Sequence, residues 1–114
     1  MSDSNLYRWS AAALVAAGIT IALFWLLTLP FESFAGAEVS LHPLFTPGQL
    51  FHVLGALLTL FGYVGLYLWQ RKEVGTLGFV GFVLAFIGAA FFLSDGMIGL
   101  VTVPAVAASA PALV

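Results

Sequence analysis

Three long runs of apolar residues, separated by short polar segments, dominate the sequence. The first run covers about residues 8–29 and ends before Pro30, the second covers 47–70, and the third covers 76–95. Each run has the length of roughly 20 residues that an α-helix needs to cross a hydrocarbon core about 30 Å thick. The pattern predicts an all-α fold, an integral membrane bundle in which each run is a transmembrane helix.

A fourth apolar stretch, residues 98–114, is interrupted by Pro104 and Pro111. Its length is close to the lower limit for a membrane span. We expect a kinked fourth helix here, and the alternative is a re-entrant or interfacial tail buried against protein. Ser94-Asp95-Gly96 is expected to end the third helix and restart the chain. The prediction is therefore three to four transmembrane helices in one domain, residues 1–114.

The connections between the runs differ in character. Residues 30–48 carry three prolines and two glutamates but no lysine or arginine, and we expect a connecting loop at the membrane surface. Thr46 is expected to cap the second helix, with Pro47 as its first residue. Residues 71–75, Arg-Lys-Glu-Val-Gly, are expected to form a charged turn. The second and third helices then form a hairpin.

The first run also has features of a secretory signal peptide, because Ala35-Gly36-Ala37 offers a cleavage site. However, the run is longer than the usual apolar region of roughly 7–15 residues in such peptides. Asp3 also weakens the positive charge expected at the start of a signal peptide. We therefore expect an uncleaved helix.

Composition agrees with a lipid environment. Hydrophobic residues make up 62% of the chain and charged residues 7%, with a mean hydropathy of +1.13. Soluble domains carry about a quarter charged residues. The net charge of -2 excludes a basic surface for nucleic acid. The absence of cysteine excludes disulfides, thiolate metal sites and iron–sulfur clusters.

The few cations predict an orientation in the cell membrane. Arg8 and the pair Arg71-Lys72 fall on one side if the first two helices both span. Because cytoplasmic segments carry the excess of lysine and arginine, the N-terminus and the 71–75 turn are expected in the cytoplasm of a multi-pass protein. The loop at 30–48 and Asp95 are then expected to face outward.

Small residues recur every three or four positions along each run, and such stripes allow helices to pack closely in lipid. The expected packing positions are Ser10, Ala13, Ala17, Gly18 and Thr20 in the first helix, Gly48, Gly55, Gly62 and Gly65 in the second, and Gly78, Gly81 and Gly88 in the third. A turn centred near Glu73 places Gly65 opposite Gly81. These glycine faces are expected to meet one another or a neighbouring helix.

The same hairpin register brings His52 to the level of Ser94 or Asp95. Ionisable groups at membrane depth are costly and often functional. We expect His52 and Asp95 to form a polar pair near the outer surface, in contact directly or through water, and His52 to make an interhelical or helix-to-loop hydrogen bond. The alternative is that a neutral His52 nitrogen ligates haem iron or the magnesium of a chlorin.

Catalytic motifs are missing from the sequence. It has no glycine-rich phosphate loop, no nucleophile elbow and no HExxH motif. His42 is the only other histidine, and its loop position does not suit a second haem ligand. No spacing supports a metal site formed by His42, Glu32 and Glu38. Internal repeats typical of transporters are also not evident. We therefore do not expect an enzyme.

Four short motifs occur from about residue 43 onward: Pro47 with His52, Gly62-Tyr63-Val64-Gly65-Leu66-Tyr67 with Gln70, Gly78-Phe79-Val80-Gly81, and Pro104-Ala105-Val106-Ala107 followed by Pro111. In these motifs the chain resembles uncharacterised small bacterial multi-helix integral membrane proteins. The resemblance implies a membrane protein and no particular activity.

The function expected from the sequence is a non-catalytic membrane subunit. It packs through its small-residue faces into a larger membrane complex or with copies of itself. The alternative is a haem- or chlorin-binding subunit of an electron-transfer or photosynthetic assembly, with His52 as the axial ligand.

Overall fold

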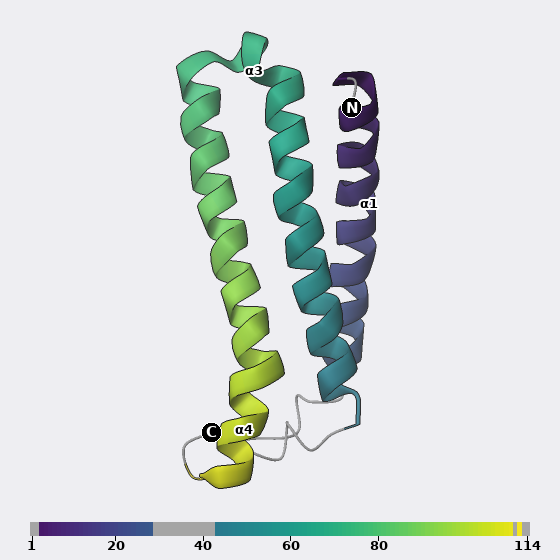
Figure 1. The fold of residues 1–114 in the computed structure, drawn as a ribbon, viewed down its shortest axis with the longest axis vertical. Helices are drawn as coiled ribbons and strands as arrows, with labels where there is room; N and C mark the ends of the chain where they lie inside the picture. Colours follow the sequence, from purple (N-terminus) through teal and green to yellow (C-terminus); the bar gives the residue numbers. More distant parts are fainter. Residues whose placement is uncertain (1–2, 29–42, 111, 113–114) are drawn as a thin grey trace.

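The computed structural model describes residues 3–28, 43–110 and 112. Its elements are α1 (Asp3–Thr28), α3 (Phe45–Met97), the π-helix η2 (Ile98–Thr102) and α4 (Val103–Ser109), as Figure 1 shows. The described part of the chain contains no strand. The all-α prediction is confirmed. The first helix begins at Asp3, earlier than the expected residue 8, because its polar leading residues are also helical.

Helix α3 consists of two arms that reverse direction at Gly75. Gly75 has φ 57° and ψ -150°, and it is the only residue inside α3 with non-helical torsion angles. This backbone conformation is open almost only to glycine, because any Cβ atom would be strained there. We call residues 45–74 the first arm and residues 76–97 the second arm. The predicted charged turn is therefore shorter than expected, since Arg71 to Glu73 remain helical.

The start of the first arm differs from the prediction. The helix begins at Phe45, and Leu44 precedes it without making a side-chain capping bond. Thr46 therefore lies inside the first turn and is not the cap. Pro47 is tolerated in that turn because the first N–H groups of a helix have no partner within the helix.

The predicted break at Ser94-Asp95-Gly96 is wrong, because α3 continues through these residues. The helix widens only at η2, where the N–H of Val103 bonds to the carbonyl of Ile98, five residues earlier. Pro104 follows at once and has no N–H to donate. A π-turn is one way in which a helix accommodates such an interruption.

The expected fourth spanning helix, 98–114, is not formed within the described residues. Helix α4 has only 7 residues and follows directly on η2, so these two elements extend the second arm. A span needs about 20 residues. Residues 111, 113 and 114 lie outside the described part of the chain.

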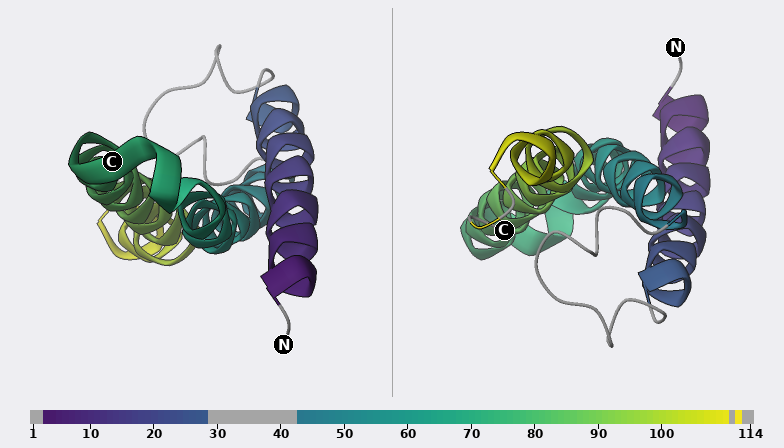
Figure 2. Two further views of the ribbon diagram at one scale, coloured as in Figure 1. Left: turned by 90° about the horizontal axis from the view of Figure 1, so that it is seen from above. Right: turned by 90° about the horizontal axis from the view of Figure 1, so that it is seen from below.

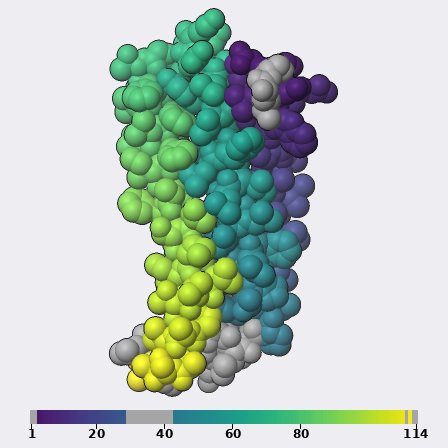
Figure 3. All heavy atoms as spheres, in the orientation of Figure 1, coloured from purple at the N-terminus to yellow at the C-terminus, as the bar shows by residue number. Residues whose placement is uncertain are grey.

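The first arm lies between α1 and the second arm, as two views show (Figures 1 and 2). The space-filling view shows one elongated body, with extents of 51 × 24 × 23 Å (Figure 3). The beginning of α1 and the reversal at Gly75 lie at the same end of this body (Figure 1). The end of α1, the start of α3 and α4 lie at the opposite end (Figure 1).

Small side chains fill much of the interior, and large apolar side chains cover the outside. Buried apolar residues include Ala13, Ala17, Ala56 and Ala89, together with the larger Phe24 and Phe45. Exposed residues include Trp9, Trp25, Leu77, Leu84 and Phe91. Two helical stretches are long and apolar enough to cross a membrane, Asp3–Thr28 and Phe45–Ser109, and the second contains the reversal at Gly75.

Candidate functional site

The glycine face of the first arm packs against α1. A Cβ atom added to Gly55 would lie 2.7 Å from Cγ1 of Ile21 and 2.9 Å from Oγ1 of Thr20. One added to Gly48 would be in ordinary contact with Leu27, at 3.8 Å from its Cβ. The side chain at Gly55 is therefore missing for a steric reason, because α1 occupies its place.

The contact is closer still toward the Gly75 end. A Cβ at Gly62 would overlap the side chain of Leu14 and lie 3.3 Å from the carbonyl oxygen of Ser10. One at Gly65 would overlap both side-chain atoms of Ser10. The facing positions Ser10, Ala13 and Ala17 are buried, so the predicted packing face of α1 is in place, with Gly18 exposed outside it.

The glycines of the second arm behave differently. Nothing lies within 4 Å of a Cβ added to Gly81 or Gly88 among the described residues, and one added to Gly78 meets only Val74 at the turn. The arms meet instead through aromatic rings, where Tyr67 stacks on Phe82 with a centroid distance of 4.6 Å. Of the two expected alternatives for the glycine faces, Gly65 faces a neighbouring helix, α1, and not Gly81.

His52 lies at the point where α1 and both arms meet. Its side chain is 2% exposed. The Nε2 atom lies 2.9 Å from the carbonyl oxygen of Phe92, to which its N–H donates a hydrogen bond. The imidazole ring lies 4.5 Å from the Phe24 ring and 4.0 Å from the Phe92 ring, measured between centroids. His52, which belongs to the first arm, therefore contacts both α1 and the second arm.

Asp95 approaches the same histidine from the second arm. Its Oδ2 atom lies 3.9 Å from Nε2 of His52, while its side chain is 77% exposed. This distance is too long for a hydrogen bond, and the N–H of Nε2 is already directed to Phe92. The two residues come to one level, as the hairpin register predicts. The main hydrogen-bond partner of His52 is nevertheless a backbone carbonyl.

A haem or chlorin does not fit against His52 in this arrangement. Phe24 and Phe92 cover the imidazole ring, and Gly96 lies so close that an added Cβ would be 3.0 Å from Cδ2. The Nδ1 atom is buried and has no hydrogen-bond partner among the described residues. The described residues contain no cluster of three metal-binding side chains. His42, Glu32 and Glu38 lie outside the described residues.

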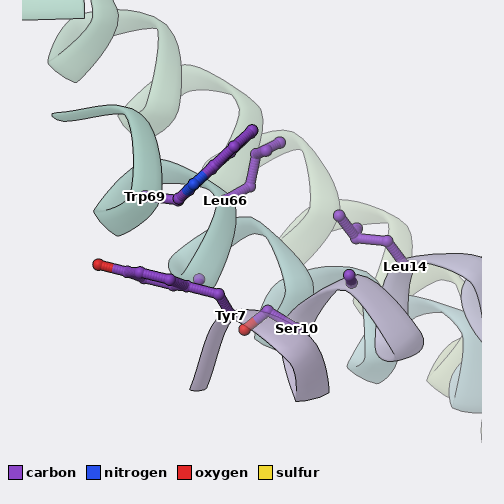
Figure 4. Close-up of a pocket in the computed structure, with 7 residues that line it drawn as sticks. Tyr7, Ser10, Leu14, Leu66 and Trp69 are labelled. Carbon is purple, nitrogen blue, oxygen red and sulfur yellow. The ribbon is translucent and has the colours of Figure 1, made fainter. Parts of the chain in front are cut away.

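A groove between α1 and the first arm lies toward the Gly75 end, with a cavity volume of about 210 Å³ (Figure 4). Tyr7, Ser10 and Ala11 contribute to its wall from α1, and Leu66 and Trp69 contribute from the first arm. The Ser10 hydroxyl oxygen is buried and has no hydrogen-bond partner among residues 3–28, 43–110 and 112. We call this the Ser10 groove.

Sequence reasoning missed several partners in these contacts. Phe24 and Gly96 were not identified as neighbours of His52, and neither was the carbonyl of Phe92. The sequence also did not indicate a contact for Gln49, whose amide packs against Gly99 in the π-turn. Gly96 and Gly99, which follow Asp95 closely, were a usable signal, since both lie where another side chain approaches the backbone.

The chemistry of the described geometry is that of helix association. Glycine contacts seat α1 on the first arm, and one histidine hydrogen bond joins the two arms at their far end. A search of protein-family models, curated proteins and solved structures gives no match to this chain.

Proposed function

We propose that this protein is a small, non-catalytic, multi-pass membrane subunit whose three transmembrane helices are α1 and the two arms of α3. The distribution of side-chain size carries the proposal. Glycine, alanine and serine fill the contact between α1 and the first arm, whereas large apolar side chains such as Trp25 and Leu84 face outward. This is the pattern of helices that associate within lipid, where burial of apolar surface gives no driving force.

The proposed orientation places the Gly75 end in the cytoplasm. Arg8 lies near the start of α1, and Arg71 and Lys72 precede the reversal at Gly75. The two segments lie at the same end of the body (Figure 1). Asp95 lies toward the opposite end, next to His52. This separation of charge supports the expected cytoplasmic N-terminus through the positive-inside rule.

The proposed partners are other transmembrane helices, supplied by a larger complex or by copies of this chain. Support comes from small residues that the described fold does not use. Gly81, Ala85 and Gly88 follow one another at steps of four and three residues along the second arm, and all three are exposed. Backbones can approach closely along such a stripe.

Purification in mild detergent or lipid nanodiscs tests this proposal. The wild-type chain, of 12.1 kDa, is expected in a larger assembly whose other members can be named by mass spectrometry. The double substitution Gly81→Leu and Gly88→Leu is expected to release it. Val80→Leu and Ile87→Leu are the matched control, because both sites are exposed on the same arm and already carry branched side chains. A wild-type chain that is monomeric in nanodiscs contradicts the proposal.

A further inference from the structure

The Ser10 groove is bordered by a hydroxyl group that no described residue pairs with. Ser10 is 2% exposed, and its Oγ atom makes no hydrogen bond within the described part of the chain. Several other hydroxyls in the helices donate to a backbone carbonyl of their own helix. Thr59 donates to the carbonyl of Gly55, and Ser109 donates to that of Ala105. The Ser10 Oγ is instead turned toward the first arm, against Gly65.

The groove around this hydroxyl is apolar and is flanked by aromatic side chains. Tyr7 and Trp69 extend from facing helices beside Ser10, and Leu66 lies across from it (Figure 4). Tyrosine and tryptophan are enriched where the hydrocarbon core meets the headgroups. Ser10 follows Tyr7 by one helical turn. In the membrane orientation proposed above, the Ser10 hydroxyl lies about one turn deeper than Tyr7, at the level expected for the ester groups of glycerophospholipids.

Charge at this end of the molecule matches the same kind of ligand. Arg8, Arg71 and Lys72 are the three lysine and arginine side chains of the sequence. They belong to the start of α1 and to the segment before the reversal, which lie at the same end of the body (Figure 1). A phosphate group at the membrane surface would lie within their field. Asp3 and Glu73 share the region, so the expected preference for an anionic over a zwitterionic headgroup is small.

We propose that the Ser10 groove binds one acyl chain of a glycerophospholipid, whose ester carbonyl accepts a hydrogen bond from the Ser10 hydroxyl. The volume suits this ligand. A cavity of about 150 Å³ holds a benzene molecule, so the 210 Å³ of the groove accommodates a section of chain but no macrocycle. In the structure the Oγ atom is buried against Gly65, so the proposed bond requires rotation about its single side-chain torsion to another staggered position that faces the groove. The proposal rests on the membrane location proposed above.

Lipids with and without an ester carbonyl provide the test. The full chain is placed in nanodiscs that contain either dioleoyl phosphatidylglycerol or its dialkyl ether analogue, which has the same headgroup and no ester carbonyl. Native mass spectrometry then measures the fraction of protein that retains one lipid. We expect the wild-type chain to retain the ester lipid roughly fivefold better than the ether lipid, the effect of about one hydrogen bond.

Ser10→Ala is expected to abolish this preference, because it removes the donor and leaves the shape of the groove nearly unchanged. Ser109→Ala is the matched control and should keep the preference, since that hydroxyl already donates to Ala105. Equal retention of both lipids by the wild-type chain overturns the proposal. A preference for the ester lipid that persists in Ser10→Ala also overturns the proposal.

A second pair of variants tests the location. Ala11→Leu places a larger side chain at the wall of the groove and is expected to lower the retention of both lipids severalfold. Ala12→Leu is the neighbouring control, an exposed position outside this groove. Identical retention in the two variants contradicts the site. A chain that inserts in the membrane and assembles with partners but shows no ester preference refutes this inference alone and leaves the proposed function standing.

Discussion

Replacing Gly65 by alanine tests how closely α1 packs against the first arm. The new Cβ would overlap the Cβ and Oγ of Ser10 and lie 3.6 Å from the Cα of that residue. Because the Cβ of Ser10 is fixed to the α1 backbone, no side-chain rotation relieves this contact, and α1 must shift. Overpacking of this kind typically costs about 1–3 kcal/mol. We expect a value near the upper limit, about 3 kcal/mol.

Gly81→Ala is the matched control, since nothing lies within 4 Å of its Cβ among the described residues. Both substitutions gain the helix propensity of alanine over glycine, at most about 1 kcal/mol. This gain cancels in the comparison, so the difference between the two variants measures the steric contact alone. The assay is reversible unfolding by sodium dodecyl sulfate in mixed micelles, followed by circular dichroism.

A compensating variant makes the test specific. Ser10→Gly removes the atoms with which the new Cβ collides, and it is expected to restore most of the stability that Gly65→Ala loses. The residual loss is about 0.5–1 kcal/mol, from the poor helix propensity of glycine. Equal stability of Gly65→Ala and Gly81→Ala would refute the close approach, as would a failure of Ser10→Gly to rescue Gly65→Ala.

Three further predictions concern His52 and the reversal. His52→Ala should lower the free energy of unfolding by about 2–4 kcal/mol, since it opens a cavity and leaves the Phe92 carbonyl without its donor; Asp95→Asn, at an exposed position, should change it by no more than about 0.5 kcal/mol. Equal losses in the same micelle assay would contradict this ranking. Adding haem to the purified chain should give no absorption band that depends on His52, because aromatic rings cover the imidazole; a Soret band lost in His52→Ala would show that the packing opens. Gly75→Ala should cost about 1–3 kcal/mol through backbone strain, whereas Gly18→Ala, in open helix, should stabilise by up to about 1 kcal/mol; an unchanged unfolding midpoint for Gly75→Ala would contradict the reversal at this residue.

The lengths of the apolar runs were sufficient to predict the helical rods and the hairpin. The sequence predicted a turn over the five residues 71–75, but it did not show that the chain reverses at Gly75 alone. The position of the strained residue depends on how much stability each arm gains from additional helical residues before the reversal. The continuation of the helix through Asp95 was not predicted for a related reason. A Ser-Asp-Gly sequence is typical of a helix end, but in this chain the residues that follow it are also helical.

The level of His52 followed from the hairpin register, because residue numbers across an antiparallel pair have a nearly constant sum. The direction of each glycine stripe did not follow from it. Gly62 and Gly65 can face either α1 or the second arm with the same spacing in sequence. In the structure Tyr67 and Phe82 stack between the two arms, while the glycines face α1. The spacing of residues in the sequence does not predict which neighbour each face meets.

The location of the two chain ends and of the reversal tests the central claim most directly. The sequence contains no cysteine, so Ser4→Cys, Thr76→Cys and Ala107→Cys each introduce one unique thiol. Intact cells are treated with a membrane-impermeant maleimide, before and after permeabilisation. We expect Ala107→Cys to react in intact cells, and Ser4→Cys and Thr76→Cys to react only once the membrane is opened. Recovery of the chain in the soluble fraction, or labelling of Ser4→Cys and Thr76→Cys from opposite sides, would contradict a membrane subunit with three spanning helices.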